Sequence, residues 1–259
     1  MRDLLSIGTS RGCEMIGTGL GLGLSGYRLQ TGQWSPSNVA TLQLWLDASD
    51  ASTLLQSSGG SLASADGDPV GYWADKSGNG RHATQTDGTK KPALKIGVQN
   101  GKNAIRLDGS NDLMALASGL QAQPRTVVIV YKKIGSKFIG LGHGSNGETG
   151  EIVDWTDGNI YSVGQSSLSS SASGNNSSYT IFCATFASNG VVTHRKNGQS
   201  RTVSSSSATS GASTINQLGA RSTDVGNGDI CELVYYDSVL SITDILNIEF
   251  YLNAKWSIY

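Results

Sequence analysis

Hydrophobic and polar residues alternate along most of the chain after about residue 38, with the two-residue period of β-strands. In 179–187, for example, Ile181 and Cys183 project to one face and Phe182 to the other. Turn signals such as SGNG, NG and SNG separate these segments. The predicted strands cover 42–48, 70–76, 103–109, 125–133, 137–144, 150–157, 159–164, 179–187, 190–198, 214–221 and 228–238.

The segment 241–256 has a helical period instead. It opens with a serine or threonine that can cap a helix, and Ile245, Ile248 and Leu252 follow at helical spacing. The pattern predicts a helix near the C-terminus of an otherwise all-β chain.

Residues 1–37 differ from the remainder because glycine recurs through them. The run GLGLG places Leu20, Leu22 and Leu24 on one face of an extended strand and glycine on the other. Glycine is costly in a strand unless another backbone approaches closely. We therefore predict an arm (1–37) that docks on a neighbouring subunit, followed by a sandwich domain (38–259). The alternative is an ordinary leading strand packed on its own sandwich.

Composition and charge narrow the function classes. Of 259 residues, 34 are glycine and only 15% are charged, which suits short strands with many turns. The net charge is −1 and the 19 lysines and arginines are scattered, which argues against nucleic-acid binding. The apolar segment 15–27 is shorter than the roughly 20 residues that a bilayer requires, so we expect no membrane insertion. Asp3, Arg11 and Glu14 interrupt the N-terminal region, which argues against a signal peptide.

The three cysteines, Cys13, Cys183 and Cys231, lack the CxxC spacing of a zinc site. Cys183 and Cys231 lie in predicted strands, where cysteine acts as a small apolar residue. A disulfide between them is left open by the sequence.

Three blocks carry a resemblance: LQLWLDASDASTL (42–54), VGYWADKSGNGRHATQ (70–85) and NGKNAIRLDGSNDLM (100–114). In this order they resemble the opening of the laminin G-like, concanavalin A-like domains of many tailed-bacteriophage and prophage structural proteins. The hairpin 179–201 and the closing strand and helix agree, so the resemblance covers about 40–257. It implies a jelly-roll β-sandwich of two antiparallel sheets.

The resemblance also implies a setting. A protein of this kind would be made in the host cytoplasm and built into the virion as a capsid decoration, tail or fibre subunit. Its partners would be other virion proteins and copies of itself. The fold alone does not fix a function, because the same sandwich serves as lectin, hydrolase or spacer. A carbohydrate-binding module for a host-surface glycan is the alternative.

Hydrolysis is disfavoured by the spacing of acidic residues. Glycan hydrolases of this fold place their carboxylates at alternate strand positions, so that they project into one groove. The nearest match is Glu148, Glu151 and Asp154, and the last two are three residues apart. They would point to opposite faces of a regular strand. We therefore predict that the protein is not an enzyme, with glycan hydrolase as the least favoured reading.

One tryptophan is a candidate for sugar binding. Trp155 lies beside Asp154 and Asp157 near a turn, where an indole ring can stack on the C–H face of a sugar. Core packing is the alternative for Trp155, and Trp45 and Trp73 are assigned to the core.

Calcium is the one cofactor considered. Asp108, Asn111 and Asp112 supply the hard oxygen ligands that calcium prefers, and so do Asp47 and Asp50. The same residue types also cap turns by bonding to nearby backbone. The sequence is therefore compatible with either a calcium site or turn formation at these residues.

Overall fold

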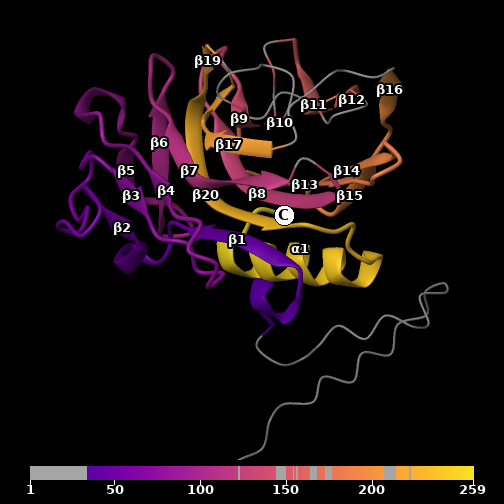
Figure 1. Cartoon of the computed structure of the whole chain (residues 1–259), viewed down its shortest axis with the longest axis horizontal. Helices are drawn as coiled ribbons and strands as arrows, with labels where there is room; N and C mark the ends of the chain where they lie inside the picture. The colour runs from indigo at the N-terminus through magenta and orange to yellow at the C-terminus, as the bar shows by residue number, and fades with distance from the viewer. Residues whose placement is uncertain are drawn as a thin grey trace, which may run out of the picture.

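The structure is a computed structural model that describes residues 34–121, 123–143, 150–153, 155, 157–163, 168–172, 177–206, 214–221 and 223–259. Strands make up 47% of the chain, which confirms the all-β prediction. Two large sheets pack face to face, and one helix covers the outside of the first sheet (Figure 1). Every strand pairing in the described part of the chain is antiparallel.

The eight-stranded sheet has the order β15-β14-β13-β8-β20-β6-β5, and β1 also pairs with β20. Its strands are β1 (Leu42–Asp47), β5 (Ala93–Gln99), β6 (Lys102–Asp108), β8 (Arg125–Lys133), β13 (Thr180–Phe186), β14 (Val192–Lys196), β15 (Gln199–Arg201) and β20 (Asn227–Tyr236).

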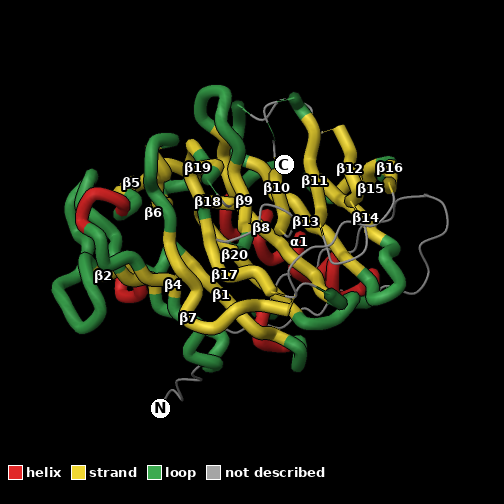
Figure 2. The backbone as a smooth tube through the Cα atoms, turned by 45° about the horizontal axis from the view of Figure 1, so that its top comes forward, coloured by secondary structure: helices red, strands yellow, loops and turns green. Residues whose placement is uncertain are grey.

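The ten-stranded sheet has the order β16-β12-β11-β10-β9-β17-β7-β4-β3-β2 (Figure 2). Its strands are β2 (Leu54–Leu55), β3 (Tyr72–Trp73), β4 (Ala83–Thr84), β7 (Met114–Gln121), β9 (Ile139–Gly142), β10 (Gly150–Val153), β11 (Asn159–Val163), β12 (Leu168–Ala172), β16 (Ser204–Ser206) and β17 (Thr214–Leu218). A small pair, β18 (Ala220–Arg221) and β19 (Asp224–Val225), and the 3-10 turns η1 (Pro36–Asn38), η2 (Ala51–Thr53) and η3 (Gly88–Lys90) complete the connections.

Strand β8 shows why the eight-stranded sheet is buried on both faces. Val127 and Ile129 belong to the core between the two sheets, whereas Val128 and Val130 belong to the core beneath the helix. Because successive side chains of a strand alternate between faces, a strand covered on both sides needs a continuous apolar run. The segment VVIV supplies it.

Helix α1 (Ile242–Trp256) closes the outer face of that sheet. Ser241 is its N-cap, and Ser241 Oγ accepts a hydrogen bond from the backbone N of Asp244 at 3.1 Å. Its buried side chains include Ile245, Ile248 and Leu252, as the helical spacing predicts. The predicted helix 241–256 is confirmed.

The predicted strand 70–76 is wrong in extent, because only Tyr72–Trp73 pair as β3. Asp75 ends the strand: its carboxylate accepts hydrogen bonds from the backbone N of Trp45 (2.9 Å), Ser77 (2.8 Å) and Arg81 (2.9 Å). The WADKSGNG block is therefore a folded turn that holds β1 against the following loop. Trp45 and Trp73 are both buried, as predicted.

Cys183 and Cys231 are free thiols, and both are buried. They lie on β13 and β20, and β8 runs between these two strands. Two strand spacings come to about 9.5 Å, which exceeds the reach of a disulfide. The bridge that the sequence left open is not formed.

Leu20, Leu22 and Leu24 lie outside the described residues, so the predicted arm stays a prediction. At Trp34 the described chain is already in contact with the sandwich, since the Trp34 and Tyr251 ring centroids are 6.0 Å apart. Pro36 is buried, and its carbonyl accepts a hydrogen bond of 3.0 Å from Tyr236 Oη. Among the residues described, none belongs to a helix long and apolar enough to cross a membrane.

Candidate functional site

Trp155 lies in the turn between β10 and β11, two neighbouring strands within the ten-stranded sheet, on the side of the sandwich away from α1 (Figure 1). Its backbone N donates to Asn159 O at 2.8 Å, and Gly158 N donates to Trp155 O at 3.1 Å. Gly158 has a φ of +78°, which glycine adopts without strain. These contacts with Gly158 and Asn159 fix the backbone position from which the Trp155 indole projects.

The Trp155 ring rests on a buried aromatic neighbour. Phe138 is 1% exposed, and its ring centroid lies 5.2 Å from that of Trp155 at an interplanar angle of 44°. Ile139 belongs to the core between the sheets, so Phe138, one position earlier, projects to the outside of the ten-stranded sheet. Trp155 and Tyr161 are partly buried and pack on it. Trp155 is thus half buried rather than fully exposed.

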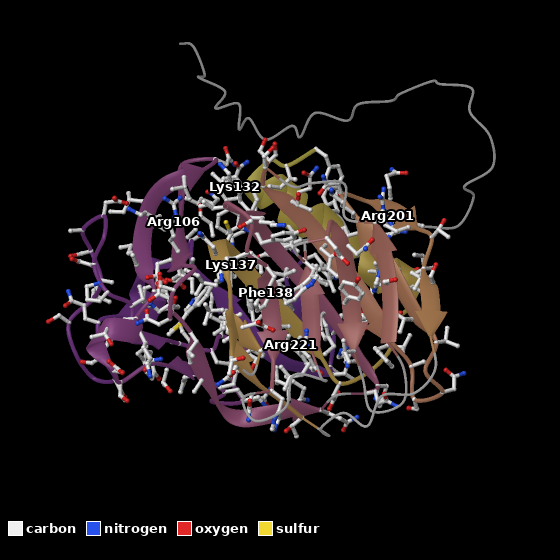
Figure 3. All side chains as sticks on the ribbon, turned by 90° about the horizontal axis from the view of Figure 1, so that it is seen from above. Arg106, Lys132, Lys137, Phe138, Arg201 and Arg221 are labelled. Atoms are coloured by element: carbon white, nitrogen blue, oxygen red, sulfur yellow. The ribbon has the colours of Figure 1, made fainter. Side chains whose placement is uncertain are left out.

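A guanidinium group stands over the same indole. The Cζ of Arg221 lies 5.7 Å from the centroid of the Trp155 ring, within the range of a cation–π contact. Arg221 belongs to β18, which approaches β9 closely because Gly142 has no side chain: a Cβ there would come within 2.8 Å of Arg221 Cα. Figure 3 looks onto this side of the molecule and labels Phe138 and Arg221.

Asp157 supplies a carboxylate at the rim. Its Oδ2 accepts a hydrogen bond of 2.5 Å from Tyr161 Oη, and its Oδ1 accepts one of 2.9 Å from Asn159 N. Partial burial acts to raise the pKa of Asp157, but the hydrogen bonds from Tyr161 and Asn159 outweigh it and lower that pKa. Asp157 is therefore an anionic acceptor at neutral pH.

We call Phe138, Trp155, Asp157, Tyr161 and Arg221 the Trp155 patch. Of the predicted glycan-binding residues, the structure brings Trp155 and Asp157 together, and Asp154 lies outside the described residues. Sequence reasoning missed Phe138 and Arg221, which come from segments 17 and 66 positions away and carry no local signal. Tyr161 could have been found, because the strand period places it on the same face as Asn159.

The predicted calcium ligands serve a turn in this structure. Asp108 Oδ1 accepts from Ser110 N (2.7 Å) and Asn111 N (3.2 Å), and Asp112 Oδ2 accepts from Asp108 N (2.9 Å). Burial, with a smaller contribution from the charge of Asp108, raises the pKa of Asp112 to about 6. In the described ranges, no group of three or more His, Cys, Asp or Glu residues is placed to hold a metal ion.

Asp47 and Asp50, the other residues considered for calcium, take part in an ion-pair network. Lys76 Nζ lies 2.9 Å from a carboxylate oxygen of each aspartate. Lys255 Nζ lies 2.6 Å from the other oxygen of Asp47. Two lysine ammonium groups therefore pair with these carboxylates, which favours the structural interpretation of Asp47 and Asp50.

The acidic triplet considered for hydrolysis is not brought to a described site. Glu148 and Asp154 lie outside the described residues. Glu151 occupies a position in β10 opposite Leu141 and Ser162. The prediction that the protein is not an enzyme therefore stays a prediction.

No protein-family model matches this chain, and the search of curated proteins found no significant match. Solved structures do resemble it. The Trypanosoma rangeli sialidase in complex with the inhibitor DANA is 14% identical over 84% of this chain and 33% of its own, with a TM-score of 0.51. The HCR/D protein, in a mutant form, is 14% identical over 83% of this chain and 51% of its own, with a TM-score of 0.53.

A weaker likeness is to the Ruminococcus gnavus sialidase module CBM40 bound to α2,3-sialyllactose, with 15% identity, 60% of this chain, 99% of that chain and a TM-score of 0.39. This chain spans about a third of the sialidase and about half of HCR/D. The fold is shared. At these identities the likeness shows the β-sandwich and nothing further, and so confirms the predicted fold class.

Proposed function

We propose that this protein binds a glycan at the Trp155 patch and does not hydrolyse it. The observation that carries the proposal is the half-buried Trp155 ring, anchored on Phe138 and flanked by Arg221 and Asp157 on the face away from α1. Because the Trp155 ring already packs on Phe138, it is ordered before a ligand binds, and little conformational entropy is lost when a ligand packs on it.

The patch offers the two kinds of contact that a sugar requires. The C–H groups of a pyranose ring pack on aromatic rings, which Trp155 and Tyr161 supply. Sugar hydroxyls both donate and accept hydrogen bonds. The guanidinium of Arg221 only donates, and the ionised carboxylate of Asp157 only accepts. A few convergent polar groups beside an apolar surface are typical of a binding site.

The experiment is a glycan array followed by calorimetric titration of the best ligand. We expect the wild type to bind, and Trp155→Ala to weaken binding at least tenfold, because the stacking surface is lost. Phe250→Ala is the matched control: Phe250 is 61% exposed but lies on α1, on the opposite side of the sandwich, and should leave affinity unchanged. No binding to any glycan, or equal affinity in Trp155→Ala, would refute the site.

The absence of hydrolysis is tested with the same ligand. Prolonged incubation should release no reducing sugar, and Glu151→Gln should leave every measured property unchanged. Turnover that disappears in Glu151→Gln would instead establish a glycan hydrolase.

We further propose that the sandwich is a subunit of a tailed-phage virion, anchored by residues 1–37. The support is the ordered set of blocks at 42–54, 70–85 and 100–114, which resembles phage structural proteins. Mass spectrometry of purified particles should detect the protein, and immunogold labelling should place it on the head, tail or fibre. Deletion of residues 1–30 should leave a folded sandwich that no longer incorporates into particles. Normal assembly of the truncated protein would overturn the anchoring role.

A further inference from the structure

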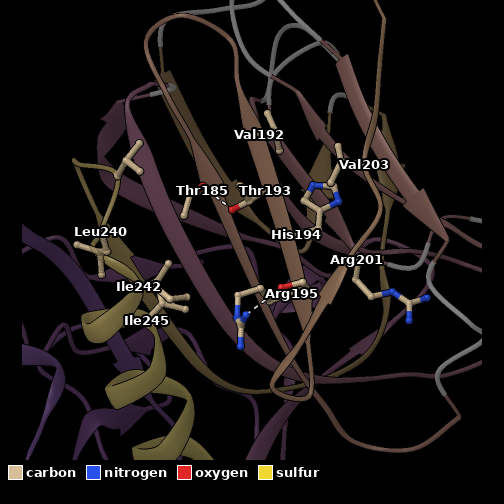
Figure 4. Close-up of a pocket in the computed structure, with 12 residues that line it drawn as sticks. Thr185, Val192, Thr193, His194, Arg195, Arg201, Val203, Leu240, Ile242 and Ile245 are labelled. Carbon is tan, nitrogen blue, oxygen red and sulfur yellow. Dashed lines mark hydrogen bonds between the residues drawn. The ribbon is translucent and has the colours of Figure 1, made fainter. Parts of the chain in front are cut away.

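A groove of about 440 Å³ runs between the start of α1 and the outer face of β14 and β15 (Figure 4). Its lining combines an aliphatic wall from the segment that leads into α1 with a floor from the edge strands of the eight-stranded sheet. The wall is formed by Val239, Leu240, Ile242 and Ile245, and the floor includes Thr185, Val192, Thr193, Arg195 and Ser200.

The wall exposes more apolar surface than its position in the fold requires. Val239 is 46% exposed and Ile242 is 44% exposed, although both adjoin the buried cluster that contains Leu240 and Ile245. Contiguous aliphatic side chains beside a concave surface mark an interaction site more often than scattered ones do.

The polar side chains of Thr185, Thr193, Arg195 and Arg201 that line the groove already have hydrogen-bond partners; Arg201 Nη2, for example, donates to Ala172 O at 2.9 Å. Thr185 Oγ1 and Thr193 Oγ1 share a hydrogen bond of 2.6 Å. Arg195 forms a bidentate pair with Glu249, with N···O distances of 2.9 and 2.8 Å. A ligand in this groove therefore gains chiefly by burying apolar surface, which favours an aliphatic segment over a sugar or a charged peptide.

We propose that this groove receives residues 18–26 of a second copy of the chain. The inference rests on the anchoring role proposed for the arm and names its receptor. In an extended strand Leu20, Leu22 and Leu24 would share one face at a spacing of about 6.8 Å, which would let them pack along the aliphatic wall. The intervening glycines let the backbone approach β15, which forms the edge of its sheet and can accept an added strand.

The topology favours a second copy over the chain's own arm. Trp34, where the described chain begins, packs on Tyr251 beside β1, and β1 pairs with β20 on the side away from β8. The groove lies on the β14–β15 side, so α1 separates the two. Self-docking would require 27–33, which span at most about 29 Å when fully extended, to pass around the surface of a helix about 10–12 Å in diameter while running about 14 Å along it. That surface path uses most of the available span, so the segment would have to be nearly extended. An arm from a neighbour meets no such constraint.

The mode of association follows from this geometry. The arm leaves its own sandwich near Trp34 and Tyr251, whereas the groove that binds it lies beside β14 and β15. Because these two surfaces differ, the contact is an arm exchange or a head-to-tail contact, which produces dimers, rings or longer arrays. We therefore expect the full chain to form oligomers whose mass rises with protein concentration.

The first experiment measures the mass of the full chain by light scattering after size-exclusion chromatography. Ile242→Asp should shift the protein to a monomer. Ile242 is the first residue of α1, where an acidic side chain suits the helix dipole, so the variant should fold. Phe250→Asp, at an exposed position of α1 outside the groove, is the matched control and should keep the wild-type mass. A wild type that stays monomeric, or an unchanged Ile242→Asp oligomer, overturns the proposal.

The second experiment separates exchange from self-docking. In full chains that also carry Cys13→Ser, Leu22→Cys and Ile242→Cys are introduced in different copies, mixed and oxidised. We expect a covalent dimer whose cross-linked peptide joins positions 22 and 242. A cross-link that forms only when both substitutions are in one chain, and that gives a monomer, shows self-docking and contradicts the proposal. Glycan affinity of Ile242→Asp should equal that of the wild type, so failure here is distinguishable from failure of the Trp155 patch.

Discussion

The indole Nε1 of Trp256 donates a hydrogen bond of 2.7 Å to Oε2 of Glu232, and neither side chain is exposed to solvent. Trp45 Nε1 donates to the other carboxylate oxygen at 2.7 Å, and Lys255 Nζ lies 2.7 Å from Oε2. Burial raises the pKa of Glu232, whereas Lys255 acts to lower it. This carboxylate ties the last turn of α1 to β20 and β1, which are distant in the sequence.

Glu232→Gln should therefore destabilise the sandwich. The amide keeps one acceptor oxygen, so one indole N–H loses its partner. Lys255 loses one of its two carboxylate partners and keeps Asp47 and a hydrogen bond of 3.4 Å to Tyr251 Oη. Breaking a buried pair of this kind costs about 3–5 kcal/mol. Urea unfolding followed by tryptophan fluorescence measures the loss. Lys90→Gln is the control, because the Lys90–Asp87 pair is about half exposed and should contribute less than about 1 kcal/mol.

His194 should make the protein sensitive to acid. Its two ring nitrogens each lie 2.8 Å from a serine hydroxyl, of Ser162 and Ser171, and the residue is 1% exposed. Burial, together with the charge of Arg125, lowers its pKa to about 4 from an ordinary 6.5. Between pH 6.5 and 4, His194 is protonated in the unfolded chain but stays neutral in the folded chain. The part of the folding free energy that depends on neutral His194 is therefore fully present above pH 6.5 and is lost as the pH falls to 4.

The size of this effect is roughly 3 kcal/mol between pH 6.5 and 4. His194→Gln should remove it, because an amide can bond to both serines without titrating. The measurement is the free energy of unfolding of both proteins from pH 4 to 7. The stability difference between them should narrow or reverse on acidification, and a constant difference would contradict the role given to His194.

Asp112 should have the opposite pH dependence. Its folded pKa of about 6 lies above the ordinary value of 3.8, so the folded chain holds its proton longer than the unfolded chain. The stabilisation that depends on protonated Asp112 is therefore lost as the pH rises from about 4 through 6. Asp112→Asn, which can still accept from Asp108 N, should be more stable than the wild type at pH 7 by about 1–2 kcal/mol and show no such gain at pH 4.

The same variant tests calcium. If calcium binds beside Asp108, Asn111 and Asp112, millimolar CaCl2 should raise the melting temperature of the wild type at pH 7 and leave that of Asp112→Asn unchanged. Equal melting temperatures with and without calcium would leave these residues with their turn-forming role alone.

Two glycines with nearly equal φ angles should respond differently to replacement by alanine. Gly219 (φ +84°) and Gly78 (φ +88°) both occupy the left-handed region. A Cβ at Gly219 would come within 2.8 Å of the buried Leu107 side chain, whereas one at Gly78 meets nothing within 4 Å. Gly78→Ala should cost about 1 kcal/mol of strain, and Gly219→Ala about 2–4 kcal/mol because overpacking adds to it. Chemical denaturation of both variants measures the difference, and equal losses would contradict the crowding argument.

The sequence alone determined much of the local structure of this protein, although it missed β5 and β7 and predicted too long a strand at 70–76. Alternation along 125–133 and 179–187 specified strands, and the burial of β8 on both faces is visible in its unbroken apolar run. Ser241 and the spacing of Ile245, Ile248 and Leu252 specified α1. These features depend on residues a few positions apart, where backbone periodicity decides which side chains share a face.

Only the tertiary structure decided which distant residues meet. Whether Asp47 meets Lys255 depends on where α1 packs on the sheet, and whether Cys183 can reach Cys231 depends on the order of the strands. Phe138 and Arg221 join Trp155 because β9, β11 and β18 converge, and no spacing in the sequence records that. Strand order is fixed by the summed burial and hydrogen bonding of whole sheets, so contacts across a hundred residues are settled together and cannot be derived one pair at a time.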